Sequence, residues 1–116
     1  MQNFDDLWAT PELLENTDMK IIDIRTPSEW QQTGIVEDSY TITFFNELGS
    51  YNIQEFQEEL NKIIDKDEKF ALICRTGSRT GQVASFLKNK FGYEVVSLNG
   101  GILKLIGEGY QTKSYN

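Results

Sequence analysis

The feature that most constrains the fold of this chain is a switch from apolar to polar residues within the stretch 70–80, FALICRTGSRT. The run 70–73 is wholly apolar, which is typical of a buried strand. The polar part begins with Cys74, the chain's only cysteine, and apolar residues then recur at spacings of three and four up to Phe91. That spacing indicates one face of a helix. We therefore predict a strand, a tight loop and a helix in that order.

The rest of the chain repeats this alternation of short apolar runs and amphipathic segments. Strands are predicted at 20–24, 40–44, 70–73 and 94–98. Helices are predicted from Pro11, from Pro27 to near Gly34, from 53 to 64, up to Phe91 and at 102–106. The order predicts an α/β fold, with a doubly wound, mostly parallel sheet of four to five strands and helices on both faces, in one domain spanning 1–116. We expect the polar tail from Gly107 to be loosely held.

The loop that begins at Cys74 is suited to bind an anion. It lies where a strand ends and a helix begins, and backbone N–H groups and the helix dipole favour negative charge there. Arg75 and Arg79 add positive charge, and Gly77 allows the left-handed backbone that lets N–H groups converge. The same surroundings stabilise a thiolate, which is the nucleophilic form of cysteine. We therefore expect Cys74 to be an accessible nucleophile that needs no general base.

Composition excludes several classes of function. The chain has no histidine, which rules out a papain-like Cys–His dyad and hydrolases that need an imidazole base. With one cysteine and no histidine, we expect no metal site and no cofactor. The net charge of −7 argues against nucleic acid and anionic membranes as partners. No apolar run approaches the roughly 18 residues of a membrane span and no secretory signal is recognisable, so we expect a cytoplasmic protein.

Three blocks of the sequence, in order, resemble single-domain rhodaneses, a family of sulfurtransferases. They are IDIRTPSEW at 22–30 with Gly34 after it, CRTGSRT at 74–80, and LNGGI at 98–102. The resemblance spans nearly the whole chain and implies a rhodanese-like fold. After Gly34 the family usually has His-Ile-Pro-Gly-Ala, whereas this chain has IVEDS at 35–39, a departure that lies outside the cysteine loop.

The resemblance implies an enzyme of the thiosulfate sulfurtransferase type. Cys74 would take the outer sulfur of a small sulfur-containing anion (thiosulfate, a polysulfide or a persulfide) and pass it from a persulfide to a thiol or another sulfur acceptor. The arginines of the loop would hold the donor's oxygens, and its N–H groups would stabilise the charge of the persulfide. The oligomeric state stays open. The loop residues with these implied roles are Arg75, Thr76, Gly77, Ser78, Arg79 and Thr80.

Residues of the first and third blocks are expected to support the loop rather than to react. Asp23 ends a predicted strand and could accept hydrogen bonds from loop N–H groups. Arg25 is expected to pair with Glu29 or with another carboxylate. Glu29 also forms a capping box with Thr26 at the start of a helix. We expect the glycine pair 100–101 to make backbone turns that pack beside the loop.

Other functions on such a fold stay open. Phosphatases and arsenate reductases of the same fold place five residues between cysteine and arginine, whereas four separate Cys74 from Arg79, and Thr80 stands where that arginine would be. A non-catalytic interaction or sensor module would need neither the cysteine nor both arginines. A sulfur carrier would share the chemistry of the enzyme and differ in its acceptor. The plain structural alternative is that Cys74 serves as a small buried apolar residue.

Overall fold

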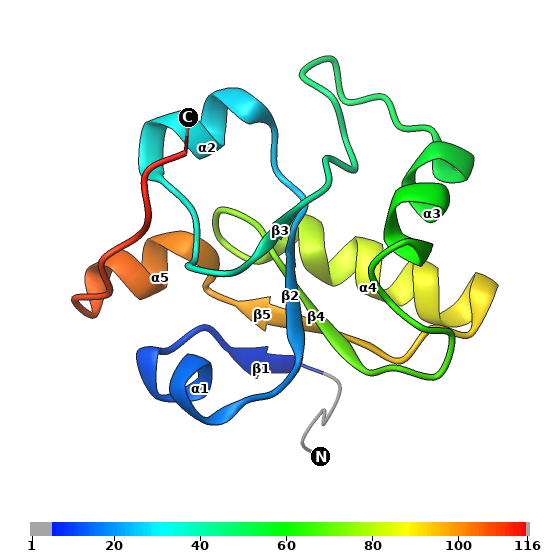
Figure 1. The fold of residues 1–116 in the computed structure, drawn as a ribbon. Helices are drawn as coiled ribbons and strands as arrows, with labels where there is room; N and C mark the ends of the chain where they lie inside the picture. The colour runs from blue at the N-terminus through cyan, green and yellow to red at the C-terminus, as the bar shows by residue number, and fades with distance from the viewer. Residues whose placement is uncertain (1–5, 116) are drawn as a thin grey trace.

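The structure, a computed structural model, describes residues 6–115, and the ends of the predicted single domain, residues 1–5 and 116, lie outside this part. Within the described residues, five parallel strands form one sheet in the order β1-β5-β4-β2-β3 (Figure 1). The strands are β1 Asp6–Trp8, β2 Lys20–Asp23, β3 Tyr40–Thr41, β4 Phe70–Ile73 and β5 Val95–Asn99. The prediction of an α/β fold with a mainly parallel sheet is confirmed.

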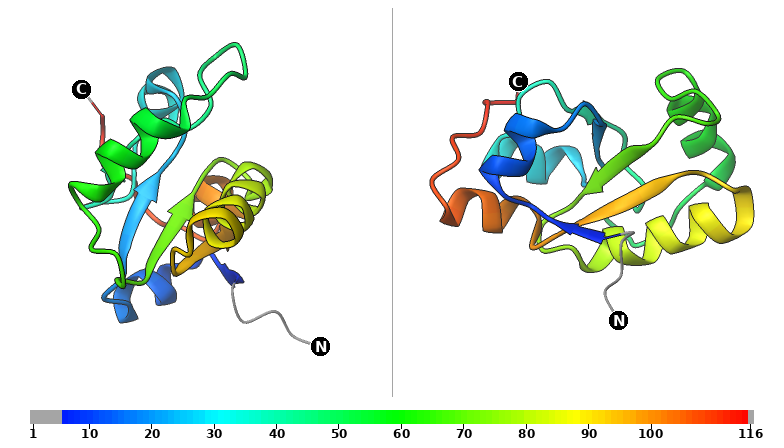
Figure 2. Two further views of the ribbon diagram at one scale, coloured as in Figure 1. Left: turned by 90° about the vertical axis from the view of Figure 1, so that its right-hand side faces the viewer. Right: turned by 90° about the horizontal axis from the view of Figure 1, so that it is seen from below.

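Helices lie on both sides of this sheet, as the alternation of strands and helices predicts. They are α1 Pro11–Asn16, α2 Pro27–Thr33, α3 Ile53–Asn61, α4 Ser78–Phe91 and α5 Gly101–Gly107. Figures 1 and 2 show α3 and α4 on one side of the sheet and α1 and α5 on the other. Among residues 6–115, no helix is both long enough and apolar enough to cross a membrane.

Several helices begin and end where the sequence predicts, because specific residues satisfy the free backbone groups at their ends. The hydroxyl oxygen of Thr10 accepts a hydrogen bond from the N–H of Leu13 at 3.1 Å and caps α1. Asn52 caps α3 in the same way, by accepting from the N–H of Glu55 at 3.1 Å. Gly92 ends α4 with a φ of 76°, a left-handed conformation that favours glycine.

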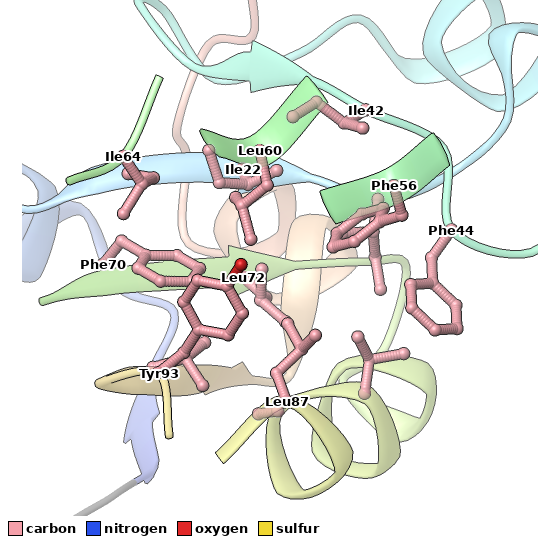
Figure 3. Close-up of a cluster of buried hydrophobic side chains, with 14 of the residues drawn as sticks. Ile22, Ile42, Phe44, Phe56, Leu60, Ile64, Phe70, Leu72, Leu87 and Tyr93 are labelled. Atoms are coloured by element: carbon pink, nitrogen blue, oxygen red, sulfur yellow. The ribbon is translucent and has the colours of Figure 1, made fainter. Parts of the chain in front are cut away.

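The two faces of the sheet carry separate apolar clusters, because side chains alternate along each strand. In β4, Phe70 and Leu72 pack toward α3 and α4, whereas Ala71 and Ile73 pack toward α1 and α5. Figure 3 shows how side chains from β2, β4, α3 and α4 meet in the first of these clusters. Cys74 follows β4 directly and continues the alternation, so its side chain belongs to the cluster under α3 and α4. The central strand thereby directs the sulfur to one face of the sheet.

Two strands differ from the sequence prediction. No strand is predicted at β1, because three residues at a sheet edge show no recognisable alternation, and Trp8 remains 63% exposed. β3 is shorter than the predicted strand 40–44, but the chain stays extended beyond it. The N–H groups of Ile42 and Phe44 still donate to carbonyl groups at the end of β2 and just after it, at 3.0 and 3.1 Å.

The C-terminal tail is bound to the rest of the domain, so the expectation of a loosely held tail is wrong. Ile35 and Lys113 form an antiparallel bridge with two backbone hydrogen bonds of 2.8 Å. The hydroxyl of Thr112 donates to the carbonyl at the end of α2 at 2.6 Å, and the ring centroids of Tyr115 and Trp30 are 5.1 Å apart. Because much of this binding uses backbone groups, the polar side chains of the tail give no sign of it in the sequence.

The tail contact is expected to depend on Gly34. Its φ is +75°, and a Cβ at this position would lie 2.6 Å from the carbonyl oxygen of Lys113 and 2.6 Å from the hydroxyl oxygen of Thr112. We predict that Gly34→Ala lowers the free energy of unfolding by about 1–3 kcal/mol, because it adds backbone strain and displaces the tail. Urea denaturation and limited proteolysis of the tail measure this.

The matched control for this experiment is Gly107→Ala, because a Cβ there meets no atom within 4 Å. The control variant should keep or slightly raise the wild-type stability, because alanine favours a helix over glycine, and should keep a protected tail. A Gly34→Ala tail that resists proteolysis as well as the wild-type tail would contradict the role assigned to Gly34.

Candidate active site

A backbone N–H group points at the sulfur of Cys74 in the loop between β4 and α4. This group belongs to Gly77 and donates to Cys74 Sγ at 3.2 Å. Gly77 is the N-cap of α4 and has a φ of 101°, which residues with side chains rarely adopt. The structure therefore brings the predicted nucleophile and the predicted loop glycine into direct contact.

The N-terminus of α5 fixes the orientation of this loop by binding its carbonyl groups. The N–H groups of Ile102, Leu103 and Gly100 donate to the carbonyls of three successive loop residues, 74–76, at 2.9, 3.1 and 3.1 Å respectively. The same bonds satisfy N–H groups at the start of α5 that have no partner within the helix. These carbonyls are thus occupied by α5, whereas the N–H of Gly77 faces the sulfur.

Gly101 allows α5 to approach the loop this closely. Its φ is +61°, and a Cβ on it would lie 2.4 Å from the carbonyl oxygens of both Cys74 and Arg75. Gly100, the N-cap of α5, also has a left-handed backbone, with a φ of 86°. The predicted role of this glycine pair, backbone turns packed beside the loop, is confirmed.

A buried hydroxyl group lies next to the sulfur and is hydrogen-bonded to a second buried hydroxyl group. Thr80 Oγ1 is 3.6 Å from Cys74 Sγ, 2.7 Å from Ser97 Oγ and 3.1 Å from the carbonyl oxygen of Gly77. A hydroxyl can rotate, so Thr80 can accept a hydrogen bond from a thiol and donate one to a thiolate. Thr80 is among the site residues predicted from the sequence, whereas Ser97 is not. A serine within an apolar strand is nevertheless a usable signal, because a buried hydroxyl needs a partner.

The sulfur itself is enclosed, contrary to the expectation of an accessible nucleophile. Cys74 is 0% exposed and belongs to the apolar cluster under α3 and α4. The outer surface of the loop consists of other predicted site residues, since Arg75, Thr76 and Ser78 are exposed. A donor can therefore reach the sulfur only when neighbouring side chains move.

Asp23 and Arg25 form a buried ion pair at the end of β2. Asp23 Oδ2 and Arg25 Nη2 are 2.8 Å apart, and both side chains are 0% exposed. The guanidinium of Arg25 also donates to the carbonyl of Gly34 at 3.0 Å. Arg25 is expected to pair with Glu29 or with another carboxylate, and the second alternative holds, because its partner is Asp23. Asp23 accepts from Arg25, backbone N–H included, rather than from the cysteine loop. The pair supports the site by joining β2 to α2.

Glu29 joins α2 to the cysteine loop. Its carboxylate accepts a hydrogen bond from each terminal nitrogen of Arg79, at 2.8 and 2.7 Å. It also accepts from the N–H of Thr26 at 3.3 Å, which is part of the predicted capping box. The hydrogen bonds from Arg79 lower the pKa of Glu29 to about 2 although partial burial opposes the shift, and they raise the pKa of Arg79. Arg79, predicted to hold a donor's oxygens, is therefore paired with a carboxylate.

The fold and this site define an α/β domain with a cysteine in the loop between β4 and α4, where α5 binds the carbonyl groups of residues 74–76 and the N–H of Gly77 donates to the sulfur. Residues 9–108 match the family model of the rhodanese-like domain. The chain therefore belongs to the rhodanese-like domain family, as its resemblance to rhodaneses implies.

Individual relatives agree with this assignment. A curated sulfurtransferase from Allochromatium vinosum is 31% identical over 91 residues, which are 78% of this chain and 75% of the relative. Among solved structures, a rhodanese-related protein from Thermoplasma volcanium is 30% identical with a TM-score of 0.66, and the match covers 90% of this chain and 94% of the chain of that protein. A rhodanese-like domain protein from Staphylococcus aureus is 25% identical with a TM-score of 0.64, and the match covers 93% of this chain and 99% of the chain of that protein.

The contact between α5 and the loop can be tested with Gly101→Ala. The added Cβ would overlap two loop carbonyls, at 2.4 Å. We expect the variant to lose about 1–3 kcal/mol of stability. We also expect faster hydrogen exchange at the N–H of Ile102, which donates to the carbonyl of Cys74. The control is Gly81→Ala inside α4, where nothing lies within 4 Å and alanine favours the helix by about 0.5–1 kcal/mol. Unchanged protection of Ile102 in Gly101→Ala would refute the proposed contact.

The Glu29–Arg79 pair is expected to make stability depend on pH in acid. The pKa of Glu29 is about 2 in the folded chain, below its ordinary value of 4.5, so folding favours the ionised carboxylate. This contribution is complete above about pH 4.5 and is lost as the pH falls towards 2. In urea denaturation over this range, Glu29→Gln should lose less stability than the wild type.

A suitable control for the acid experiment is Glu47→Gln, because it removes a carboxylate near the start of α2 and keeps the Glu29–Arg79 pair. As the pH falls, the control variant should still lose the stability that the pair contributes. If Glu29→Gln and the wild type lose the same amount of stability as the pH falls, the pair does not stabilise the fold.

Proposed function

We propose that this protein is a sulfurtransferase that moves a sulfane sulfur through a persulfide on Cys74. The observation that carries the proposal is the hydrogen bond of 3.2 Å from the N–H of Gly77 to Cys74 Sγ, in a loop whose carbonyls are bound by α5. A fixed N–H donor stabilises negative charge on the sulfur without a basic side chain. The relation to the sulfurtransferase from Allochromatium vinosum supports the same class of reaction.

In the first step, the Cys74 thiolate attacks the outer sulfur of the donor. A bond forms between the two sulfur atoms, the S–S bond of the donor breaks, and the leaving group keeps the bonding electrons. That group is sulfite from thiosulfate, or a thiolate from a persulfide. Because these anions are stable, the step needs no general acid, which fits a chain without histidine. Thr80, hydrogen-bonded to Ser97, is in place to donate to the thiolate.

In the second step, the sulfur passes from Cys74 to an acceptor. The charge on the outer sulfur of the persulfide would lie among the N–H groups of residues 75–80. A thiol, or cyanide in an assay, then attacks that sulfur, and the Cys74 thiolate is regenerated. A reducing compartment such as the cytoplasm would supply thiol acceptors and suits a chain with one cysteine.

The loop supports sulfur transfer better than phosphatase chemistry. The position that a phosphatase-type loop gives to its phosphate-binding arginine is occupied by Thr80, which is 0% exposed and hydrogen-bonded to Ser97. The nearby Arg79 binds the carboxylate of Glu29. A tetrahedral phosphate would therefore find no free guanidinium at the end of this loop.

Mass spectrometry of the intact protein tests the proposed function. After incubation with thiosulfate or with an organic persulfide, we expect one extra sulfur atom on Cys74. Cyanide should remove it with formation of thiocyanate, and Cys74→Ser should not acquire it. Hydrolysis of an aryl phosphate by a chain that acquires no sulfur would instead favour a phosphatase. Neither sulfur loading nor turnover with any donor would favour a non-catalytic module.

A further inference from the structure

Arg79 is held by a carboxylate that is itself fixed in place. Both terminal nitrogens of Arg79 donate to Glu29, at 2.8 and 2.7 Å. Glu29 Oε1 also accepts hydrogen bonds from the N–H and the hydroxyl of Thr26, at 3.3 and 3.2 Å, at the start of α2. The side chains of Arg79 and Glu29 are only 29% and 22% exposed, so water and salt screen this pair less than a fully exposed one.

This pairing changes the charge that a donor meets at the loop. Glu29 balances the positive charge of Arg79. The loop's other guanidinium, that of Arg75, is exposed. A second carboxylate, that of Glu47, accepts a hydrogen bond from Ser28 at 2.9 Å at the same end of α2. The chain as a whole carries a net charge of −7. The surroundings of the sulfur are therefore poorly suited to attract a dianion.

The two classes of sulfur donor differ in the charge that they bring to such a site. Thiosulfate is a dianion, and its oxygens need guanidinium or N–H partners. An organic persulfide, R–S–SH, with an uncharged R group carries at most a single charge, and this charge lies on the sulfur to be transferred. The N–H of Gly77 already points at the place where the two sulfur atoms would meet. A carboxylate beside the loop therefore disfavours thiosulfate more than it disfavours a persulfide.

We propose that Glu29 determines the donor specificity of this site: by binding Arg79, it favours organic persulfides over thiosulfate. The inference rests on the proposed sulfurtransferase function and narrows its donor. In the reaction, the Cys74 thiolate bonds to the outer sulfur of R–S–SH, the S–S bond breaks, and R–S⁻ leaves with the bonding electrons. The proton stays on the transferred sulfur, so the products are a Cys74 persulfide and a thiolate, and no oxidant or reductant is consumed.

The test compares two donors in three forms of the full chain. The donors are the persulfide of 2-mercaptoethanol, whose R group is uncharged, and thiosulfate, with cyanide as the acceptor, and rates with Cys74→Ser give the uncatalysed background. The wild type should have a higher kcat/KM with the persulfide. Glu29→Gln frees Arg79 and should raise kcat/KM for thiosulfate relative to the persulfide by about tenfold, mainly by lowering KM. Glu47→Gln, which removes a neighbouring carboxylate but leaves the Glu29–Arg79 pair, should keep the wild-type ratio.

The outcomes separate this inference from the proposed function. If neither donor places sulfur on Cys74, the sulfurtransferase function itself fails. If both do, a wild-type preference for thiosulfate overturns the donor inference alone. An unchanged ratio of the two kcat/KM values in Glu29→Gln also overturns the donor inference, provided that cooperative thermal unfolding shows this variant to be folded. An equal change in Glu47→Gln would assign the effect to general charge rather than to Arg79, and would also overturn it. The wild-type preference needs no variant, so the inference stays testable if Glu29→Gln does not fold.

Discussion

The hydrogen bonds from the first turn of α5 to the carbonyl groups of residues 74–76 are the constraint on which the site depends. A loop that binds an anion must turn its N–H groups inward, and its carbonyl oxygens then need partners elsewhere. In this fold, α5 supplies those partners, and Gly101 removes the side chain that would hold the two segments apart. The central position of β4 in the sheet then sets where the sulfur lies.

Two ion pairs around this loop connect elements that the sheet alone would not connect. Asp23–Arg25 is fully buried and joins β2 to the end of α2, and Glu29–Arg79 joins the start of α2 to α4. The short helix α2 is thus tied at both ends and also contacts the tail through Trp30. Loss of one partner would leave a charge without compensation, which is most unfavourable in the buried pair. The same pairing that orders α2 therefore decides which charges remain free near the sulfur.

Sequence reasoning predicts the parts of this protein that local signals determine. The apolar run before Cys74, the caps at Thr10 and Asn52, and the glycine pair next to the loop all correspond to observed structure. Local signals do not determine the partners of Arg25 and Arg79, because a long guanidinium side chain can reach several carboxylates and only the folded arrangement selects one. Enclosure of the sulfur likewise depends on side chains that arrive from α3 and α4, and the tail is bound partly through backbone groups.

The enclosure of Cys74 bears on how long a bound sulfur would survive. Peroxides and stray thiols attack sulfur species that they can reach, and a side chain with 0% exposure is shielded from both. A persulfide formed there would be protected from oxidation and from premature capture.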